Sequence, residues 1–406
     1  MTPRRPPAAI DSAAVDSAAG WVAVGAAFTA MTAVFGVAYS FGAFFAPMAA
    51  EFGVGSGATS LVFSITACCW FLLGPVSGRA VDRFGPRPVL LVGAAALAGG
   101  LLLTSTAQQL WVGYVGYGLG VGIAVACGYV PMVAVVGAWF DRRRALAIGI
   151  AVAGIGVGTL AGPPVAAVLI AASGWRQAHV LLGLGGALLL VVGAVVVRRP
   201  PEPVGGEPLA LREVVRTAEF RVVYLATLLA SVALFVPFVF LPTAAAAVGV
   251  PPVAAAALIG VIGVASVAGR LVIGLVADRF GRVRTFQACF ALLGGSFLIW
   301  FLATSWPGFV AFAVVLGTGY GGWIALQPTV LAQAFGVRGL GALVGLVYTA
   351  AGVGALAGPP LAGVVVDATG GFGWAIAGAG LFGVGAFLAL LALPAERRGR
   401  AGPGSP

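Results

Sequence analysis

The chain has 406 residues, of which 61% are hydrophobic and only 8% are charged. Soluble domains carry about 25% charged residues, so this composition excludes an ordinary soluble protein and indicates a membrane protein. All 22 basic residues are arginine and the net charge is +10. Because basic loops set the orientation of a membrane protein, this charge does not imply nucleic acid as a partner.

Twelve apolar runs predict twelve transmembrane helices in two sets of six. The first set lies at about 21–46, 58–81, 88–107, 110–140, 145–172 and 178–197. The second set lies at about 222–248, 253–277, 285–303, 307–335, 340–366 and 372–393. We therefore expect an all-α membrane protein with a tail over 1–19, a six-helix bundle over 20–197, a linker over 198–221, a second six-helix bundle over 222–394 and a tail over 395–406. The linker has an expected short amphipathic helix over 209–217.

Arginine is distributed unevenly between the two sides of these spans. Twenty of the 22 arginines lie in the two tails and in the loops after spans 2, 4, 6, 8 and 10. The positive-inside rule then places both termini in the cytoplasm. Of the remaining two, Arg176 lies on the opposite side and Arg270 lies inside span 8.

The two halves of the chain share two motifs at one offset. The sequence Gly78–Gly85 matches Gly274–Gly281, and Leu160–Pro164 matches Leu356–Pro360, both at 196 residues (274 − 78 and 356 − 160). A fixed offset indicates a duplicated bundle. Arg270 has no counterpart in the first half, which favours a functional role over a structural one.

The charged loops after spans 2 and 8 are candidates for a conformational latch. Glycine allows two helices to approach closely, and aspartate can bond to arginine or to a helix N-terminus. A latch of this kind would hold the cytoplasmic side shut in one state. The simpler alternative is an orientation signal that only keeps these loops inside. The candidate latch residues are Gly78, Asp82, Arg83, Gly274, Asp278 and Arg279.

The twelve spans, the repeat and the doubled Gly-x-x-x-Asp-Arg-x-Gly loop together resemble the major facilitator superfamily over about residues 21–393. That resemblance implies two bundles that enclose a midplane cavity and rock to expose it to either side. The sequences Tyr39–Gly53, Trp139–Gly149 and Gly174–His179, together with Arg270, are similar to the bacterial monocarboxylate and oxalate/formate porter families. This narrower resemblance implies a bacterial inner-membrane protein whose Arg270 holds a substrate carboxylate.

The chain departs from those families at three places. Ala351 replaces a lysine of the oxalate/formate exchangers, and Tyr39 lies in the region where animal monocarboxylate carriers have a lysine. Ser266, one turn before Arg270, stands where the animal carriers have an aspartate. The proton-handling groups of the animal proteins are therefore missing. The resemblance still implies proton symport as the leading coupling, while anion exchange and uniport stay open.

Arg270 is the main candidate for the substrate site. It lies about eight residues from the charged loop, roughly 12 Å into a core about 30 Å thick. An arginine at that depth costs about 3 kcal/mol on insertion scales, so it must face a partner, a cavity or a ligand. One buried cation neutralises one anion, and a dicarboxylate would bring a second, unpaired charge. We therefore expect a small monocarboxylate such as lactate or pyruvate. The alternative is a structural arginine bonded to backbone carbonyls.

Other polar and aromatic residues at membrane depth are candidate substrate contacts, with packing as the alternative for each. On span 10, Tyr320, Trp323 and Gln327 are predicted to share one helix face. The candidates beside Arg270 are Ser266, Tyr39, Tyr129, Gln327, Tyr348 and Trp323. His179, the only histidine, is expected at the outer interface without a mechanistic duty.

Several function classes are disfavoured by missing patterns. The four cysteines show no metal-binding spacing, and no Walker loop is present, so we expect no metal, no cofactor and no ATP. An enzyme is not expected because no catalytic combination shares one depth. A drug exporter and a non-transporting sensor remain further alternatives. The expected partners are a small carboxylate, a proton and the lipid bilayer, with the chain acting as a monomer.

Overall fold

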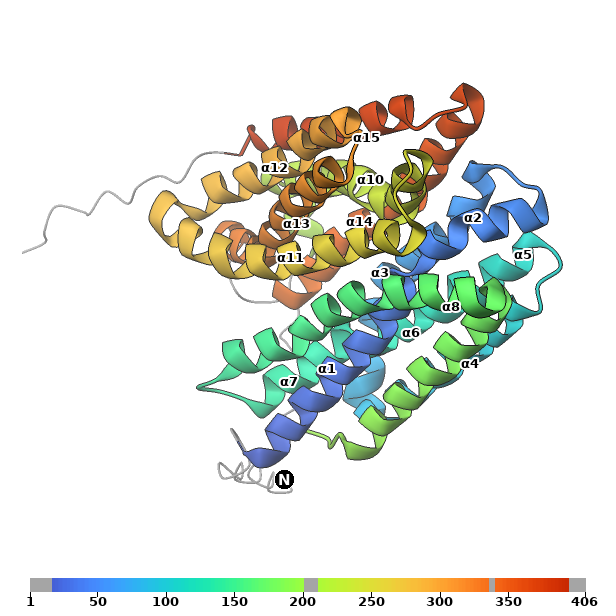
Figure 1. Cartoon of the computed structure of the whole chain (residues 1–406). Coiled ribbons are helices and arrows are strands. Elements are labelled where there is room, and N and C mark those ends of the chain that lie inside the picture. The colour runs from blue at the N-terminus through green and yellow to red at the C-terminus, as the bar shows by residue number, and fades with distance from the viewer. Residues whose placement is uncertain (1–16, 201–210, 336–339, 394–406) are drawn as a thin grey trace, which may run out of the picture.

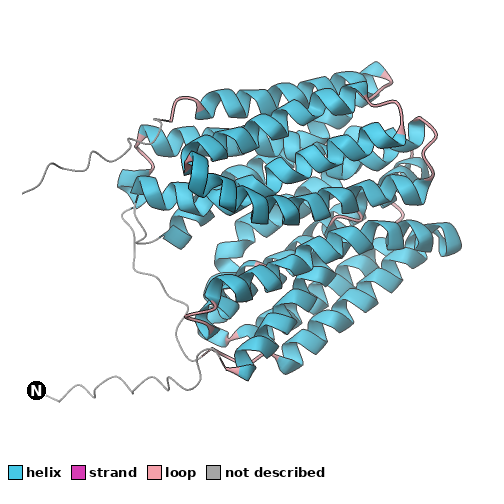
Figure 2. Ribbon diagram, turned by 60° about the vertical axis from the view of Figure 1, so that its left-hand side comes forward, coloured by secondary structure: helices cyan, strands magenta, loops and turns pink. Residues whose placement is uncertain are grey.

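The computed structural model describes residues 17–200, 211–335 and 340–393, and within these ranges it is helical without strands. The helices form two bundles that lie side by side (Figure 1, Figure 2). The predicted tails, apart from residues 17–19, and residues 201–210 of the predicted linker lie outside the described residues. Of the linker helix expected over 209–217, residues 211–214 are helical and form α9 (Leu211–Val214).

The first bundle contains the six predicted N-terminal spans. Span 1 consists of α1 (Ala18–Ala38) and α2 (Phe41–Phe52), followed by α3 (Ser56–Phe84) and α4 (Pro86–Ser105). Span 4 is formed by α5 (Leu110–Gly113), the π-helical η1 (Tyr114–Val121), α6 (Gly122–Gly128) and α7 (Val130–Trp139). Spans 5 and 6 run through α8 (Arg144–Val196).

The long helix α8 is two membrane spans separated by a break. At Gly174 the backbone leaves the helical region, with φ 79° and ψ 162°. A positive φ is accessible to glycine without strain, so this residue lets the chain reverse there. By length and composition, the described residues contain 11 helices able to cross a membrane, with α8 counted once. Division at Gly174 gives the twelve spans that the sequence predicted.

The second bundle contains the remaining six spans, one helix each. They are α10 (Ala218–Ala247), α11 (Pro252–Phe280), α12 (Arg282–Leu302), α13 (Trp306–Phe335), α14 (Leu340–Thr369) and α15 (Gly373–Leu390). Most of these bounds lie within a few residues of the predicted ones.

Glycine residues allow backbone-to-backbone contact inside each bundle. In the first bundle, Gly154, Gly158 and Gly162 of α8 face backbone carbonyls of α1, and a Cβ at any of them would collide with those carbonyls. In the second, Gly354 and Gly358 of α14 face carbonyls of α10 in the same way. We call these two contacts the glycine seams. They repeat at the 196-residue offset, so the doubled glycine motif serves helix packing in both halves.

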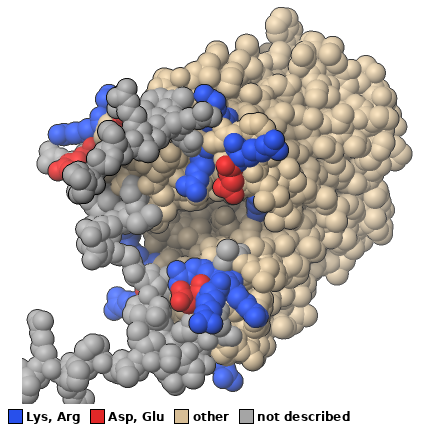
Figure 3. All heavy atoms as spheres, turned by 90° about the vertical axis from the view of Figure 1, so that its left-hand side faces the viewer, with Lys and Arg blue, Asp and Glu red and all other residues tan. Residues whose placement is uncertain are grey.

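The two bundles meet along α3 with α14 and along α8 with α11. The end with the loops after α3, α7 and α11 is the Arg-rich end. Figure 3 looks onto it and shows a hollow between groups of charged side chains. The latch candidates Asp82 and Asp278 are exposed there. A Cβ on Gly78 or Gly274 would have no neighbouring atom within 4 Å. The predicted close approach at these glycines is therefore absent from this conformer.

The opposite end is closed by contacts between the bundles. Asp367, near the end of α14, accepts hydrogen bonds from the backbone N–H groups of Ser56 (2.8 Å) and Gly57 (3.0 Å) at the start of α3. Gly363 of α14 also lies against Gly57, where a Cβ would come within 2.6 Å of its backbone nitrogen. The conformer is thus sealed at this end and hollowed at the other.

Candidate functional site

Arg270 lies between the two bundles, where its side chain lines two small cavities. Their volumes are about 10 and 30 Å³. Tyr39, Ile155 and Tyr320 also line both, so the walls come from span 1 and α8 of one bundle and from α11 and α13 of the other. A water molecule needs about 10–15 Å³ of such space, so the two cavities in this conformer have room for only a few waters.

The smaller cavity contains two hydrogen-bond donors without partners. Ser266 is 3% exposed, and its Oγ makes no hydrogen bond within the described residues. The Nε of Arg270, one helical turn further along α11, is likewise buried and unbonded. Gly263 and Val267 of the same helix also line this cavity and add no polar side chain. Two buried donors that converge on one space are suited to an acceptor such as a carboxylate.

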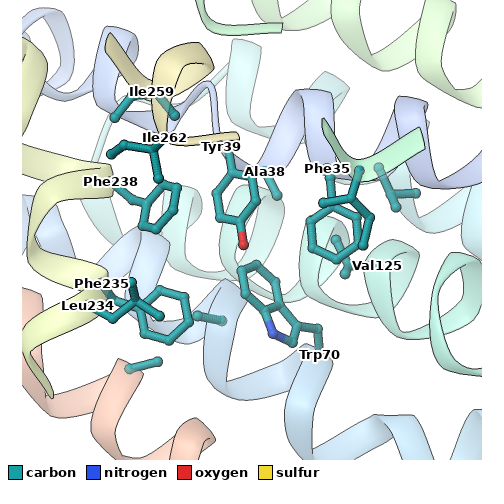
Figure 4. Close-up of a cluster of buried hydrophobic side chains, with 14 of the residues drawn as sticks. Phe35, Ala38, Tyr39, Trp70, Val125, Leu234, Phe235, Phe238, Ile259 and Ile262 are labelled. Carbon is teal, nitrogen blue, oxygen red and sulfur yellow. The ribbon is translucent and has the colours of Figure 1, made fainter. Parts of the chain in front are cut away.

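The larger cavity is walled mainly by aromatic side chains, which join the two bundles. Tyr39 of span 1 stacks on Phe238 of α10, with ring centroids 4.4 Å apart and an interplanar angle of 20°. Trp70 and Phe71 of α3 each lie 6.0 Å from Phe235 of α10. Figure 4 shows Tyr39, Trp70, Phe235 and Phe238 gathered at this boundary. We call Tyr39, Trp70, Phe71, Phe235 and Phe238 the aromatic seal.

No carboxylate of the described residues compensates the charge of Arg270. The residues that line the two cavities include no aspartate, glutamate, lysine or histidine. The ion pair between Glu51 and Arg176, at 2.8 Å, lies inside the first bundle and at its closed end. A guanidinium keeps its proton under all ordinary conditions, so the site bears a permanent positive charge.

The structure brings five of the predicted substrate contacts to one place. Arg270 and Tyr39 line both cavities, Ser266 lines the smaller one, and Tyr129 and Tyr348 line the larger one. These five come from spans 1, 4, 8 and 11. Spans that are distant in sequence therefore converge on the arginine, as the interpretation of Arg270 as a cavity residue requires.

Trp323 and Gln327 of α13 lie outside the linings of these two cavities. Trp323 is 2% exposed and packs on Phe290 of α12, with centroids 5.1 Å apart. The Nε2 of Gln327 donates to the Oγ1 of Thr227 on α10 at 3.3 Å, within the second bundle. Tyr320 of the same helix lines both cavities, and Ile324 lines the larger one. The face of α13 that meets the cavities therefore carries Tyr320 and Ile324, which are four residues apart.

Some lining residues were not anticipated from the sequence. Thr159 and Ile155 of α8 reach the cavities from the first bundle, and the Thr159 Oγ1 donates to the Ile155 carbonyl at 2.7 Å. Trp70 and Phe238 belong to uniformly apolar stretches, where no local signal separates a cavity wall from a lipid-facing side chain. Gly156, the small residue next to Ile155, also lines the smaller cavity, and a small residue of this kind is the one local indication of a cavity wall.

His179 lies at the start of span 6, five residues after the break at Gly174, as expected, but its side chain does not face an interface. Its side chain is fully buried inside the first bundle, stacked on Phe44 with centroids 3.9 Å apart. Tyr117 and Trp175 also contact it edge-on. The residue is part of an aromatic core and does not line either cavity at Arg270.

Two six-helix bundles spanning a membrane, with the half-buried side chain of Arg270 lining cavities between them, define a membrane transporter rather than an enzyme. The family model of the Major Facilitator Superfamily matches residues 26–223 and 223–405. The chain therefore belongs to the Major Facilitator Superfamily.

Known relatives and solved structures agree with this assignment. The chain is 32% identical to monocarboxylate transporter 3 of Rattus norvegicus over 371 residues, covering 87% of this chain and 75% of that protein. It is 31% identical to monocarboxylate transporter 13 of Bos taurus over 386 residues, covering 93% and 90%. A bacterial homolog of the human lysosomal transporter Spinster, in an inward-facing and unoccupied conformation, superposes with a TM-score of 0.73. At 16% identity over 93% of this chain and 98% of that one, it shows the fold alone.

Proposed function

We propose that this protein transports a small monocarboxylate, such as lactate or pyruvate, by alternating access. The observation that supports the proposal most directly is Arg270, a permanent cation without an ion pair in the described chain, facing a cavity between the two bundles. Two relatives named as monocarboxylate transporters, each above 30% identity, support the same substrate class.

A carboxylate would accept two hydrogen bonds from the planar guanidinium of Arg270. The Ser266 hydroxyl, which has no partner of its own in the described chain, is positioned in the same cavity for a further donation. Tyr39 and Tyr348 supply hydroxyl groups in the larger cavity for an oxygen elsewhere on the substrate. Since the present space holds only a few waters, the aromatic seal must move when the acid binds. Neutralisation of the charge on Arg270 then favours closure around the substrate.

The orientation and the state of the carrier follow from the same reasoning. We place the Arg-rich end, and with it both termini, in the cytoplasm of a bacterial inner membrane. The hollow at that end makes this conformer the inward-open one. The paired loops with Asp82 and Asp278 would close that end in the opposite state, because their glycines have free space here and would then be able to meet neighbouring helices.

Uptake of labelled L-lactate or pyruvate into proteoliposomes tests the substrate and the site together. Arg270→Ala should abolish uptake, while size-exclusion profile and melting temperature show that the variant still folds. Arg270→Lys keeps the charge and loses the two-point geometry, so it should retain reduced uptake. A thermal-shift panel should show stabilisation by monocarboxylates and less by oxalate. Uptake at the original rate by Arg270→Ala would overturn the proposal.

A further inference from the structure

We infer that the first bundle carries a binding site for an anionic phospholipid at the Arg-rich end. The site consists of two neighbouring cavities, where the start of α1, the start of α4 and the end of α8 meet. Their volumes are about 470 and 350 Å³, and sites for small molecules commonly have about 300–1,000 Å³. Arg87 and Arg198 line both cavities, and Arg199 lines the second. The two cavities share no lining residue with those at Arg270.

The positive charge of these cavities is not compensated by an acid. Within the described part of the chain, neither lining includes an aspartate or a glutamate. Arg198 also has no hydrogen-bond or ion-pair partner among those residues. Three arginine side chains without an acid attract an anion. A phosphate suits them best, because a guanidinium can donate two parallel hydrogen bonds to its oxygens.

Backbone carbonyls hold two of the three arginines in place. The Nε of Arg87 donates to the Val197 carbonyl at 2.9 Å, and its Nη2 donates to the Val195 carbonyl at 3.3 Å. Both carbonyls lie at the end of α8, where a helix leaves acceptors unsatisfied. The Nη2 of Arg199 donates to the Asp82 carbonyl at 2.7 Å. Since a guanidinium has five N–H groups, both side chains are positioned by the protein and keep donors for a ligand.

Apolar side chains beside the arginines favour a lipid over a free phosphate ion. Val22 of α1 and Val195 and Val196 of α8 line the first cavity. Phe84 of α3 and Pro88 of α4 line the second. All five are exposed, so on a membrane-spanning bundle they are available to contact acyl chains while the arginines bind the headgroup. In the orientation proposed above, this end meets the cytoplasmic leaflet, whose anionic lipids attract basic residues.

The second bundle has no equivalent site, which supplies a matched control. At the 196-residue offset, the three arginines correspond to Val283, Pro394 and Ala395, none of which is basic. Arg284, near the start of α12, is exposed at the same end of the molecule. It lines neither cavity. Replacement of Arg284 therefore removes one positive charge from the same level of the membrane without touching the proposed site.

The experiment measures lipid binding to the delipidated full-length protein in detergent by native mass spectrometry. Phosphatidylglycerol should bind at least about tenfold more tightly than phosphatidylcholine, whose headgroup carries a compensating cation. Arg198→Gln should weaken binding of phosphatidylglycerol about fivefold, and Arg198→Lys, which keeps the charge, should retain most of it. Arg284→Gln should change the affinity by less than about twofold. Because Arg198 has no partner in the described chain, its variants should keep the melting temperature of the lipid-free protein.

Equal affinities for phosphatidylglycerol and phosphatidylcholine would overturn the inference. An equal loss of affinity in Arg198→Gln and Arg284→Gln would also overturn it, because binding would then reflect overall charge. Soluble glycerol 3-phosphate has the phosphate without acyl chains and should not displace the lipid at a comparable concentration. Displacement would show that the site takes a soluble phosphate ester and would contradict a lipid site. Uptake is not measured, so failure of this inference leaves the proposed function intact.

Discussion

Replacement of Asp367 by alanine should shift the protein toward a conformer that opens at the end opposite the Arg-rich one. Its carboxylate caps the N-terminus of α3 from the other bundle, through the N–H groups of Ser56 and Gly57. The N-cap residue Gly55 provides no side-chain cap of its own. Loss of an N-cap side chain costs about 1 kcal/mol, and solvent exposure of Asp367 gives no reason to expect more. That free energy corresponds to about a fivefold change in the ratio of the two conformers.

The shift can be measured as a distance distribution between spin labels at Gln108 and Thr304. These exposed residues lie in loops of different bundles at the closed end, after α4 and after α12. In Asp367→Ala, the population with the longer distance should rise about fivefold. Asp367→Asn keeps an acceptor oxygen and should shift the ratio by less than about twofold, because asparagine and aspartate are similar N-caps.

A matched control exists at the same end of the molecule. Glu51 pairs with Arg176 at 2.8 Å, and both residues belong to the first bundle. Glu51→Ala removes the same charge from the same end without touching the boundary between the bundles, so it should leave the distribution unchanged. The reasoning is refuted if Asp367→Ala leaves the distances as they were, or if Glu51→Ala produces an equal shift.

Further predictions concern the seams, the seal and the loops of the Arg-rich end. Gly358→Leu should greatly lower the melting temperature in detergent, because its side chain would meet a carbonyl of α10, whereas Gly78→Ala, with open space around it, should not. Tyr39→Ala should lower the melting temperature through loss of a stacked pair worth about 0.5–1.5 kcal/mol with Phe238, plus a cavity. In the same variant, inhibition of lactate uptake by bulkier acids such as benzoate should strengthen. Asp278→Asn should raise the population with the shorter Gln108–Thr304 distance, opposite to Asp367→Ala. Asp278 is exposed in this conformer, so a latch made by it would stabilise only the opposite conformer. An unchanged distance distribution would argue against a latch.

The sequence could predict the features that depend on local composition. Apolar length predicts the spans because each must cross the same hydrocarbon thickness, and the depth of Arg270 follows from its distance to the charged loop. Contacts between the bundles could not be predicted, because helical periodicity does not define the register of one bundle against the other. Asp367 shows this limit: it is a single acid at the end of an apolar span, and its sequence does not reveal Ser56 as its partner. On α13, Tyr320 and Ile324 line the larger cavity and Gln327 does not. The sequence could not predict this either, because it also depends on how the bundles pack against each other.

The cap at the closed end breaks the pseudo-symmetry of the two halves. At the 196-residue offset, Asp367 corresponds to Ala171, which has no side-chain acceptor. Ser56 corresponds to Pro252, which has no N–H to donate. The equivalent contact between α8 and α11 therefore cannot form. Among the described residues, a polar cap therefore holds the closed end at the boundary between α3 and α14 and has no counterpart between α8 and α11.

The glycine seams have a mechanical consequence. With no side chain between them at Gly354 and Gly358, α10 and α14 pack backbone to backbone, so we expect the two helices to move together as one arm. This arm holds Phe238 near the depth of the arginine and Asp367 at the rim. A small rotation of this arm that separates Phe238 from Tyr39 would also move Asp367 away from α3. The displacement would be larger at Asp367, which lies further along the arm. A ligand-driven change near Arg270 would thus break the contact of Asp367 with α3 at the closed end in the same movement.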